Sequence, residues 1–312
     1  TRDERQRDAM IDLLRKRVPN IVYARQDIPY SKREHKRRVN PFRKGPHSMK
    51  VVTWNIRGLE SKRLEVTEYL WRREVGVALF QETNWTGESE IELQHYRVVS
   101  GTTKKPTEGL MANSSRKGVA VVVHQSLEAS EMVSRSERLA LARVQRGKGV
   151  LPIVFGAGHM PYVWQGQGNR DKRVAELQLW WAAVASSHAA GCPVMVGADL
   201  NQENIRTIQA DLRAAGVPLR VAPLSGELGT RIDTSRGKVP KWRHYDYFLV
   251  NEAAELELLG GAHADRRTLQ WRRHGAKGRS IADRPILLSD HVPVHIEVHT
   301  LRSRRRGRRR VR

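Results

Sequence analysis

The stretch PVMVGADLN, residues 193–201, is a nearly continuous apolar run that ends in an aspartate and an asparagine. A short apolar run that breaks at polar residues is typical of a buried strand that runs into a loop. Further runs of strand length occur on both sides of it, and segments with helical spacing lie between them. We expect strands at 50–56, 75–82, 118–124, 138–146, 150–158, 193–200, 244–250 and 289–298, and helices at 61–73, 169–190 and 203–215.

The order of these elements indicates the fold class. Several expected strands follow one another between residues 118 and 158 without an intervening helix, which implies antiparallel pairing. Strands and helices alternate elsewhere, so the pattern excludes a simple doubly wound parallel sheet and favours an α/β sandwich with mixed sheets. The sequence has no P-loop, dinucleotide fingerprint or solenoid repeat.

The two ends of the chain are basic and poor in apolar residues. Residues 1–48 include SKREHKRRVNPFRKGPHS, which we expect to form a flexible basic arm. Residues 300–312 are rich in arginine and are expected to be disordered. This tail is either merely solvated or serves in phosphate binding or nuclear import. A single domain is expected between the arms, at 49–299.

The overall charge restricts the partners. The chain has 56 Lys and Arg against 33 Asp and Glu, a formal net charge of +23. Such an excess attracts polyanions, chiefly nucleic acid or an anionic membrane. No apolar stretch approaches the roughly 18 residues of a membrane span, so we expect nucleic acid and no membrane. The single cysteine, Cys192, excludes an internal disulfide. We therefore expect an intracellular, nuclear protein.

Polar residues stand where several of the expected strands begin or end. Any one of them alone is more often a helix cap or a turn residue. Strand ends of one sheet face a common rim, however, so that many such residues together indicate a site. The residues are Asn55, Glu82, His159, Asp199, Asn201, Asp246, Asp290 and His291.

Some of these side chains suit a metal ion. Glu82, together with Asp290 or Asn55, offers the hard oxygen ligands that Mg²⁺ prefers. Mg²⁺ keeps several of its waters and also binds substrate phosphate, so one or two carboxylates are enough. We expect Mg²⁺ as the cofactor, with Mn²⁺ as a possible substitute.

The other side chains suit hydrolysis of a phosphodiester. Asp199 could accept a proton from an attacking water, and Asn201 could hold that water or a phosphate oxygen. His291 could donate to the phosphoryl oxygen as negative charge develops. Asp246 could orient His291, because a carboxylate fixes the tautomer of a partner imidazole. Together these types predict metal-assisted hydrolysis.

Five motifs carry a resemblance to a known family. TWNIRGL, FQETNW, GADLN, HYDYFLV and SDHVPV occur in an order that resembles the endonuclease/exonuclease/phosphatase superfamily, which includes abasic-site endonucleases, DNase I and the endonuclease domains of non-LTR retrotransposons. The resemblance covers residues 49–299. It implies a DNase I-like four-layer α/β sandwich, in which two packed, mixed and largely antiparallel sheets are flanked by helices. It also implies the same roles for the residues named above.

His159 departs from the pattern of the retrotransposon and abasic-site enzymes. Those enzymes usually have a Tyr at this point, followed two residues later by Pro, whereas this chain reads GHMP. A His here is similar to DNase I and to the sphingomyelinase branch, where it contacts the phosphate. We therefore count His159 as a catalytic candidate, against the alternative of a histidine satisfied at a loop start. The departure argues against specificity for abasic sites.

Substrate contacts are expected beside the rim. Arg57, Arg116, Lys104 and Lys105 could bind phosphates, although an ordinary solvated loop explains them nearly as well. Trp85 could stack on a base or cap the core.

The sequence thus predicts a Mg²⁺-dependent endonuclease that nicks double-stranded DNA, in the manner of a retrotransposon endonuclease domain that belongs to a polyprotein with a reverse transcriptase domain. One alternative is an RNA-directed nuclease or another phosphatase of the same superfamily. A second is a nucleic-acid-binding module without catalysis.

Overall fold

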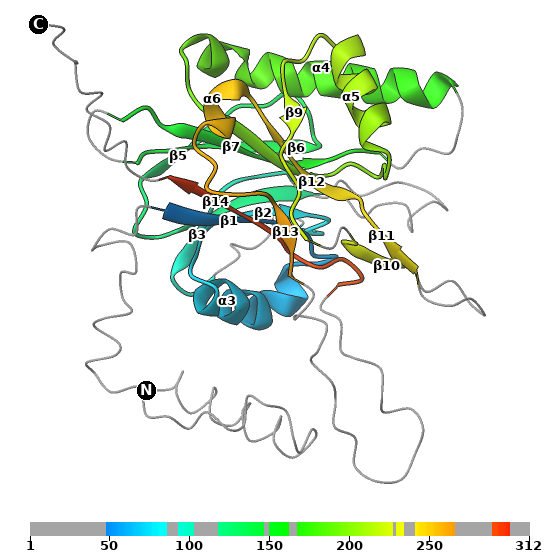
Figure 1. Cartoon of the computed structure of the whole chain (residues 1–312). Helices are drawn as coiled ribbons and strands as arrows, with labels where there is room; N and C mark the ends of the chain where they lie inside the picture. The colour runs from blue at the N-terminus through cyan, green and yellow to red at the C-terminus, as the bar shows by residue number, and fades with distance from the viewer. Residues whose placement is uncertain are drawn as a thin grey trace, which may run out of the picture. The chain divides into compact units, whose positions relative to one another are not determined.

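The structure is a computed structural model, and it describes residues 48–85, 93–102, 118–146, 150–161, 167–226, 229–233, 241–265 and 289–299 (Figure 1). The basic arm up to residue 47 and the tail from residue 300 lie outside these ranges, so their expected disorder stays a prediction.

The first sheet has six strands in the order β13-β14-β1-β2-β4-β3. Its parallel pair, β1 and β2, is connected through helix α3 (Arg63–Arg72), which follows a short 3-10 turn at Glu60–Lys62, and its other neighbours are antiparallel. The strands are β1 (Ser48–Asn55), β2 (Val75–Gln81), β3 (Tyr96–Gly101), β4 (Val119–His124), β13 (His263–Ala264) and β14 (Val294–His299).

The second sheet also has six strands, in the order β5-β6-β7-β8-β12-β9. Its parallel pair, β7 and β8, is connected through the long helix α4 (Gln167–Ala189), and the other pairs are antiparallel. The strands are β5 (Ala129–Met132), β6 (Leu139–Val144), β7 (Ile153–His159), β8 (Val194–Asp199), β9 (Arg220–Val221) and β12 (Asp246–Val250). Helices α5 (Ile205–Ala214) and α6 (Glu252–Glu255) and a two-stranded ribbon, β10 (Arg231–Asp233) with β11 (Lys241–Arg243), complete the described elements.

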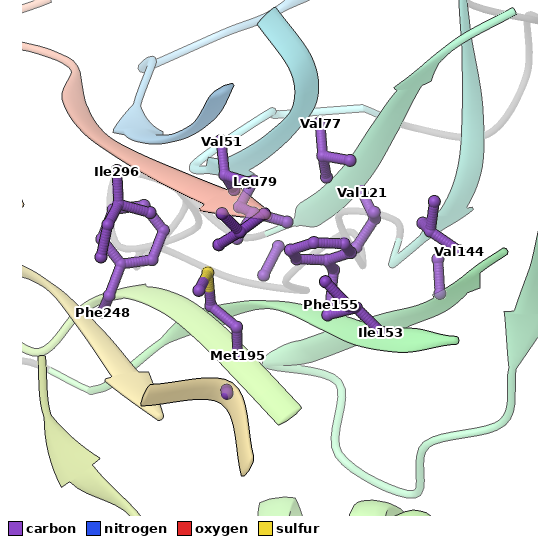
Figure 2. Packing of buried hydrophobic residues seen from close by; sticks show 14 of the residues in the cluster. Val51, Val77, Leu79, Val121, Val144, Ile153, Phe155, Met195, Phe248 and Ile296 are labelled. Carbon is purple, nitrogen blue, oxygen red and sulfur yellow. The ribbon is translucent and has the colours of Figure 1, made fainter. Parts of the chain in front are cut away.

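The two sheets pack face to face through an apolar core. Figure 2 shows Phe155 and Met195 of the second sheet against Leu79 and Val121 of the first. A second cluster joins the outer face of the first sheet to α3, and a third joins the outer face of the second sheet to α4 and α5 (Figure 1). Strands covered on both faces read as continuous apolar runs, as β2 does. The predicted four-layer α/β sandwich is confirmed.

The described elements differ from the expected ones in several places, and β3, β5, β9, β13 and α6 have no counterpart among the expected elements. The last strand begins at Val294 rather than at 289, because Pro293 has no N–H to give to a ladder and the preceding residues form a loop. The ribbon β10–β11 has no counterpart in the expected pattern, since its strands are only three residues long and polar. Within the described ranges, no helix combines the length and apolar character that a membrane crossing requires.

Gly197 of β8 lets the two sheets approach each other beside the strand ends. A Cβ there would lie 2.7 Å from Thr53 Cβ and 2.7 Å from Leu79 Cδ1, both on the opposite sheet. The side chain of Gln81 uses this close approach, because its Nε2 donates to Thr53 Oγ1 (3.0 Å) and across to the carbonyl of Gly197 (3.1 Å). The sheets are therefore joined by hydrogen bonds as well as by apolar contact.

We expect Gly197→Ala to lower the free energy of unfolding by about 1–3 kcal/mol, because the added methyl overpacks a contact in which Thr53 Cβ cannot move without its backbone. Urea denaturation followed by circular dichroism measures the change. Gly260→Ala is the matched control, since a Cβ at Gly260 meets no atom within 4 Å. Equal unfolding midpoints for the two variants would contradict this account of Gly197.

Candidate active site

The predicted polar residues meet at one rim of the sandwich, where strands of both sheets end. Asp199, the last residue of β8, is the cross-strand partner of His159 on β7 and of Asp246 on β12. Asn55 ends β1 on the other sheet, and Glu82 directly follows β2. The expectation that these strand ends share a rim therefore agrees with the observed register.

Asn55 connects the carboxylates of the two sheets. Its Nδ2 donates to Glu82 Oε1 (3.0 Å) and to Asp199 Oδ2 (2.9 Å). Asn55 and Asp199 are almost fully buried, and Glu82 is only 9% exposed. Two carboxylates this close in a buried setting repel each other, and one amide group that donates to both reduces that repulsion. The arrangement holds Asp199 and Glu82 at the same amide nitrogen of Asn55.

His291 and Asp246 form a buried pair. His291 Nδ1 lies 2.8 Å from Asp246 Oδ2, and His291 Nε2 lies 3.8 Å from Asp199 Oδ2. Burial by itself would lower the pKa of His291, but the charge and hydrogen bond of Asp246, followed by the charges of Asp199 and Asp290, raise this pKa to about 9. At neutral pH the ring is therefore a cation that carries a proton on Nε2, directed toward Asp199.

Asn201 and His159 form the other side of Asp199. The backbone N–H of Asn201 donates to Asp199 Oδ1 (2.9 Å), and its Nδ2 donates to the carbonyl of Met160 (2.8 Å). His159 Nε2 lies 3.5 Å from Asn201 Nδ2 and 3.8 Å from Glu82 Oε1. Burial lowers the pKa of His159, despite the opposing charges of Asp199 and Glu82. His159 is therefore neutral at pH 7, unlike His291.

The chain turns sharply as it leaves the strands at this rim. Arg57, Glu82 and Asn201 have φ values of 50°, 50° and 49°. For residues with a Cβ this left-handed conformation costs roughly 1–2 kcal/mol each, and such strain often gathers at functional sites. The conformation at Glu82 is held by its neighbours, because the carbonyl of Glu82 accepts from Gly58 N (2.7 Å) and Thr83 N donates to the carbonyl of Gly118 (3.0 Å).

Asp290 lies between two arginines. Arg57 Nε is 2.7 Å from Asp290 Oδ1, and Arg231 Nε is 3.1 Å from Asp290 Oδ2. Arg57 Nε is also 3.8 Å from Glu82 Oε2. Asp290, which is expected at the metal, is thus in an ion pair at both carboxylate oxygens, and its Oδ1 accepts no hydrogen bond from the described residues.

A divalent cation fits beside Glu82 and Asn55. The buried oxygens Asn55 Oδ1 and Glu82 Oε2 accept no hydrogen bond from any residue that the structure describes, although such oxygens normally have a partner. Possible ligand atoms of Glu82, His159 and Asp199 lie within 4.8 Å of one another. Asp199, Asp246 and His291 form a second such group, but there His291 is cationic and bonded to Asp246. Hard oxygen donors suit Mg²⁺, so the first group is the better site.

Of the predicted substrate contacts, the structure places Arg57 and Trp85. Trp85 packs at the edge of the cluster under α3, where its ring would meet a Cβ at Gly101. Lys104, Lys105 and Arg116 lie outside the described residues, so their phosphate contacts stay predictions.

Sequence reasoning missed several residues that support the site. Thr230 Oγ1 accepts from the backbone N–H groups of Tyr245 (3.0 Å) and Asp246 (3.3 Å), which fixes the start of β12. Ser289 Oγ donates to the carbonyl of Asn55 (2.6 Å), so a hydrogen bond joins the first motif, TWNIRGL, to the last one, SDHVPV. Ser289 could have been chosen because it opens SDHVPV, but no local signal singles out Thr230.

Arg173 of α4 is hydrogen-bonded to the loop that follows β8. Its Nη1 donates to the carbonyl of Leu200 (2.7 Å), and its Nε donates to the buried Asp211 of α5 (2.9 Å). A buried arginine paired with a carboxylate and a carbonyl is held in one geometry. The two helices thereby hold the backbone that carries Asp199 and Asn201.

Two histidines without a predicted role are buried between the first sheet and α3. His124 stacks near Trp71, and His295 Nε2 is hydrogen-bonded to the hydroxyl of Tyr69. Burial and then the charge of His95 lower the pKa of His124 to about 4. Burial is also the main cause that lowers the pKa of His295 to about 3, followed by the charges of His263, Arg73 and Lys50. Both rings are neutral in the folded protein at pH 5–7.

The free energy of unfolding is expected to fall as the pH is lowered from 6.5 to 5. In this window the unfolded chain protonates His124 and His295, whereas the folded chain does not, so stability is present above pH 6.5 and decreases below it. Two such groups contribute a loss of about 3 kcal/mol over this range. His291 opposes this loss by less than about 0.5 kcal/mol, because its raised pKa keeps it charged in the folded chain, whereas the unfolded chain gains this proton within the window. Urea midpoints that are equal at pH 6.5 and 5 would contradict the expectation.

Comparison with other proteins identifies the fold. No protein-family model matches the sequence, and neither does any curated protein. Among solved structures, the catalytic domain of Xenopus laevis APE2 has a TM-score of 0.58 at 14% identity, over 80% of this chain and 91% of that one. An AP endonuclease from Archaeoglobus fulgidus has a TM-score of 0.56 at 15% identity, over 81% and 100%. This chain has the endonuclease/exonuclease/phosphatase fold.

The endonuclease domain of TRAS1, a telomere-specific non-LTR retrotransposon, has the same fold, with a TM-score of 0.51 at 14% identity, over 80% of this chain and 98% of that one. The resemblance seen in the five motifs is thus confirmed for the endonuclease/exonuclease/phosphatase fold. At these identities the comparison establishes architecture, and the chemistry has to be argued from the residues at the rim.

Proposed function

We propose that this protein is a metal-dependent phosphodiester hydrolase that cuts nucleic acid. The observation that carries the proposal is the position of Asp199. It lies between a neutral group, Asn55, and a cationic one, His291, beside two buried oxygens of Asn55 and Glu82 that accept no hydrogen bond from the described residues. A base, an acid and a place for a metal within one buried rim are the parts that phosphodiester hydrolysis requires.

Asp199 is the proton acceptor in this mechanism. The N–H of Asn201 and the amide of Asn55 each occupy one of its oxygens, which fixes the orientation of the carboxylate. Its remaining lone pairs can accept a proton from water as the water oxygen bonds to phosphorus and the P–O ester bond breaks. A positioned base is effective because the geometry is set before the reaction begins.

His291 stabilises the charge that develops on the phosphate. Asp246 holds the ring through Nδ1, so the protonated Nε2 is directed into the rim. A donor fixed in a buried setting binds the more negative transition state better than the substrate. His159 and Asn201 lie on the other side of Asp199 and position a phosphate oxygen or the attacking water.

Glu82 and Asn55 would hold the divalent cation, as Mg²⁺ or Mn²⁺. When bound, the cation supplies positive charge for the phosphate oxygens and the leaving oxygen. Asp290, the other metal ligand expected from the sequence, is paired with Arg57 and Arg231 instead.

We further propose that the substrate is double-stranded DNA and that the protein nicks it as a retrotransposon-type endonuclease, in a nuclear setting and next to a reverse transcriptase domain of a longer polyprotein. The net charge of +23 supports a polyanionic substrate, and the similarity to the TRAS1 domain supports the choice of DNA. His159 in place of the expected Tyr argues against abasic sites. RNA and other phosphoesters are the competing substrates.

Incubation with supercoiled plasmid tests the proposal. We expect nicked plasmid in Mg²⁺ or Mn²⁺ and none in EDTA. An abasic duplex, poly(A) RNA and sphingomyelin under the same conditions measure the substrate preference. Plasmid binding without EDTA-sensitive nicking would instead identify a binding module without catalysis. Faster cleavage of poly(A) or sphingomyelin would overturn the choice of DNA.

A further inference from the structure

Asp290 is the centre of a small charge cluster that faces the rim. Its two carboxylate oxygens are each in an ion pair with an arginine, Arg57 at 2.7 Å and Arg231 at 3.1 Å. The side chains of both arginines are 28% exposed and that of Asp290 is 20% exposed. They are therefore neither in the core nor freely solvated.

Backbone pairing fixes these three residues relative to one another. Ile232 N donates to the carbonyl of Asp290 (2.9 Å), and Val292 N donates to the carbonyl of Thr230 (2.7 Å). These bonds place Arg231, which lies between Thr230 and Ile232, alongside the segment that carries Asp290 and His291. The guanidinium of Arg231 is further restrained by the ring of Tyr245, whose centroid lies 5.5 Å away.

Arg231, on strand β10 of the ribbon, has donor groups that a further ligand could use. Arg231 reaches Asp290 through Nε, and its two Nη amino groups donate to no residue within the described ranges. Burial opposes its charge, but Asp290 and then Asp199 raise the pKa of Arg231, so it stays cationic and within electrostatic reach of the proposed base. The two amino groups of a planar guanidinium match two oxygens of a phosphate.

The same contacts make Asp290 a poor metal ligand. A carboxylate binds Mg²⁺ through an oxygen lone pair, and here each oxygen already faces a guanidinium. A cation at Asp290 would stand beside two positive charges. Glu82 is farther from a guanidinium, since Arg57 Nε lies 3.8 Å from Glu82 Oε2 but 2.7 Å from Asp290 Oδ1.

We propose that Asp290 is a positioning residue that holds Arg57 and Arg231 as a guanidinium pair for the non-bridging oxygens of the scissile phosphate, while the metal is held at Asn55 and Glu82. This differs from the sequence-based expectation that Asp290 binds the metal. The inference rests on the proposed function, because it assigns a phosphodiester to the site. Arg231 becomes a catalytic residue that no sequence motif marks.

Nicking kinetics test the arginine pair. Loss of one fixed donor to a developing charge costs about 10²-fold in kcat, so we expect this loss for Arg231→Gln with KM changed less than about threefold. Arg231→Lys should recover part of kcat, and added guanidinium ion should partly rescue Arg231→Ala, which a purely structural role would not allow. Arg243→Gln, on the neighbouring strand and paired with Glu203, is the control and should stay within about twofold of the parent. A kcat for Arg231→Gln within that same range would overturn the proposal.

The metal affinity of the protein, measured without nucleic acid, tests whether the metal is held at Asn55 and Glu82 rather than at Asp290. Titration with Mn²⁺ followed by calorimetry measures the dissociation constant of each variant. The double variant Asp290→Asn with Arg231→Gln keeps the net charge of the site and should bind Mn²⁺ within about twofold of the parent, whereas Glu82→Gln should bind at least about tenfold more weakly. If the double variant loses as much affinity as Glu82→Gln, Asp290 is a ligand and the proposal fails.

The parent protein separates this inference from the proposed function. A parent that shows no EDTA-sensitive nicking contradicts the proposed function. If the parent nicks plasmid, two results would contradict only the guanidinium pair. One is an unchanged kcat for Arg231→Gln, and the other is weakened Mn²⁺ binding by the double variant.

Discussion

Replacing Asp199 by asparagine is expected to lower kcat for plasmid nicking by about 10³-fold, because the variant has no carboxylate to accept the proton of the attacking water. The size of the side chain is unchanged, and the amide oxygen of the substituted side chain could still accept from the N–H of Asn201. KM should therefore change little. The comparison to make is between single-turnover rates of the parent and Asp199→Asn at equal Mg²⁺ concentration.

The controls for Asp199→Asn have to distinguish the loss of the proton acceptor from unfolding of the variant. Asp171→Asn removes an equal charge from an exposed position on α4 and should nick as fast as the parent. The circular dichroism spectrum of Asp199→Asn should match that of the parent, which would show that the fold is retained even though one amide donor now faces Asn55 Nδ2. A nicking rate within tenfold of the parent would show that another group accepts the proton.

The second large effect is expected at the His291–Asp246 pair. His291→Gln removes the cationic donor that faces the phosphate and should lower kcat by about 10³-fold. Asp246→Asn leaves the ring in place but removes the charge that keeps it protonated, so a smaller loss of about 10²-fold is expected. The double variant should be no slower than His291→Gln alone, since Asp246 acts through the ring.

A double-mutant cycle checks this dependence. Losses that multiply in the double variant would mean that Asp246 and His291 act independently, against the contact of 2.8 Å between them. His263→Gln, on an exposed ring of β13, is the control and should keep the parent rate. A full rate for Asp246→Asn would contradict the orienting role of Asp246.

The sequence was sufficient for the layers and for most of the rim because both depend on local patterns. Long apolar runs such as VGVALFQE are strands that are covered on both faces, and their polar last residues necessarily reach the edge of the sheet. The meeting of Asn55 with Asp199 followed from this rule, although the two residues come from different sheets. The order of five motifs supplied the rest of the fold.

Arg231 and Thr230 could not be found in the same way. The ribbon that carries Arg231 is held by pairing with residues 290–292, about 60 positions later, and no periodicity in a three-residue strand records such a partner. The ion pairs of Asp290 with Arg57 and Arg231 could not be found from the sequence either. Residue type alone suggested a metal ligand, and only the spatial arrangement shows two guanidiniums beside it.

The pairing of β1 with β14 has a consequence for the timing of synthesis. β14 is made last among the described strands, yet it lies antiparallel to β1, with Ser48 opposite His299. Asp290 and His291 immediately precede β14 and reach the rim only when that strand has docked. A chain still on the ribosome, with β14 inside the exit tunnel, would hold Asn55, Glu82 and Asp199 without their acid. Such a nascent chain would lack the cationic donor that the proposed hydrolysis requires until β14 has left the tunnel.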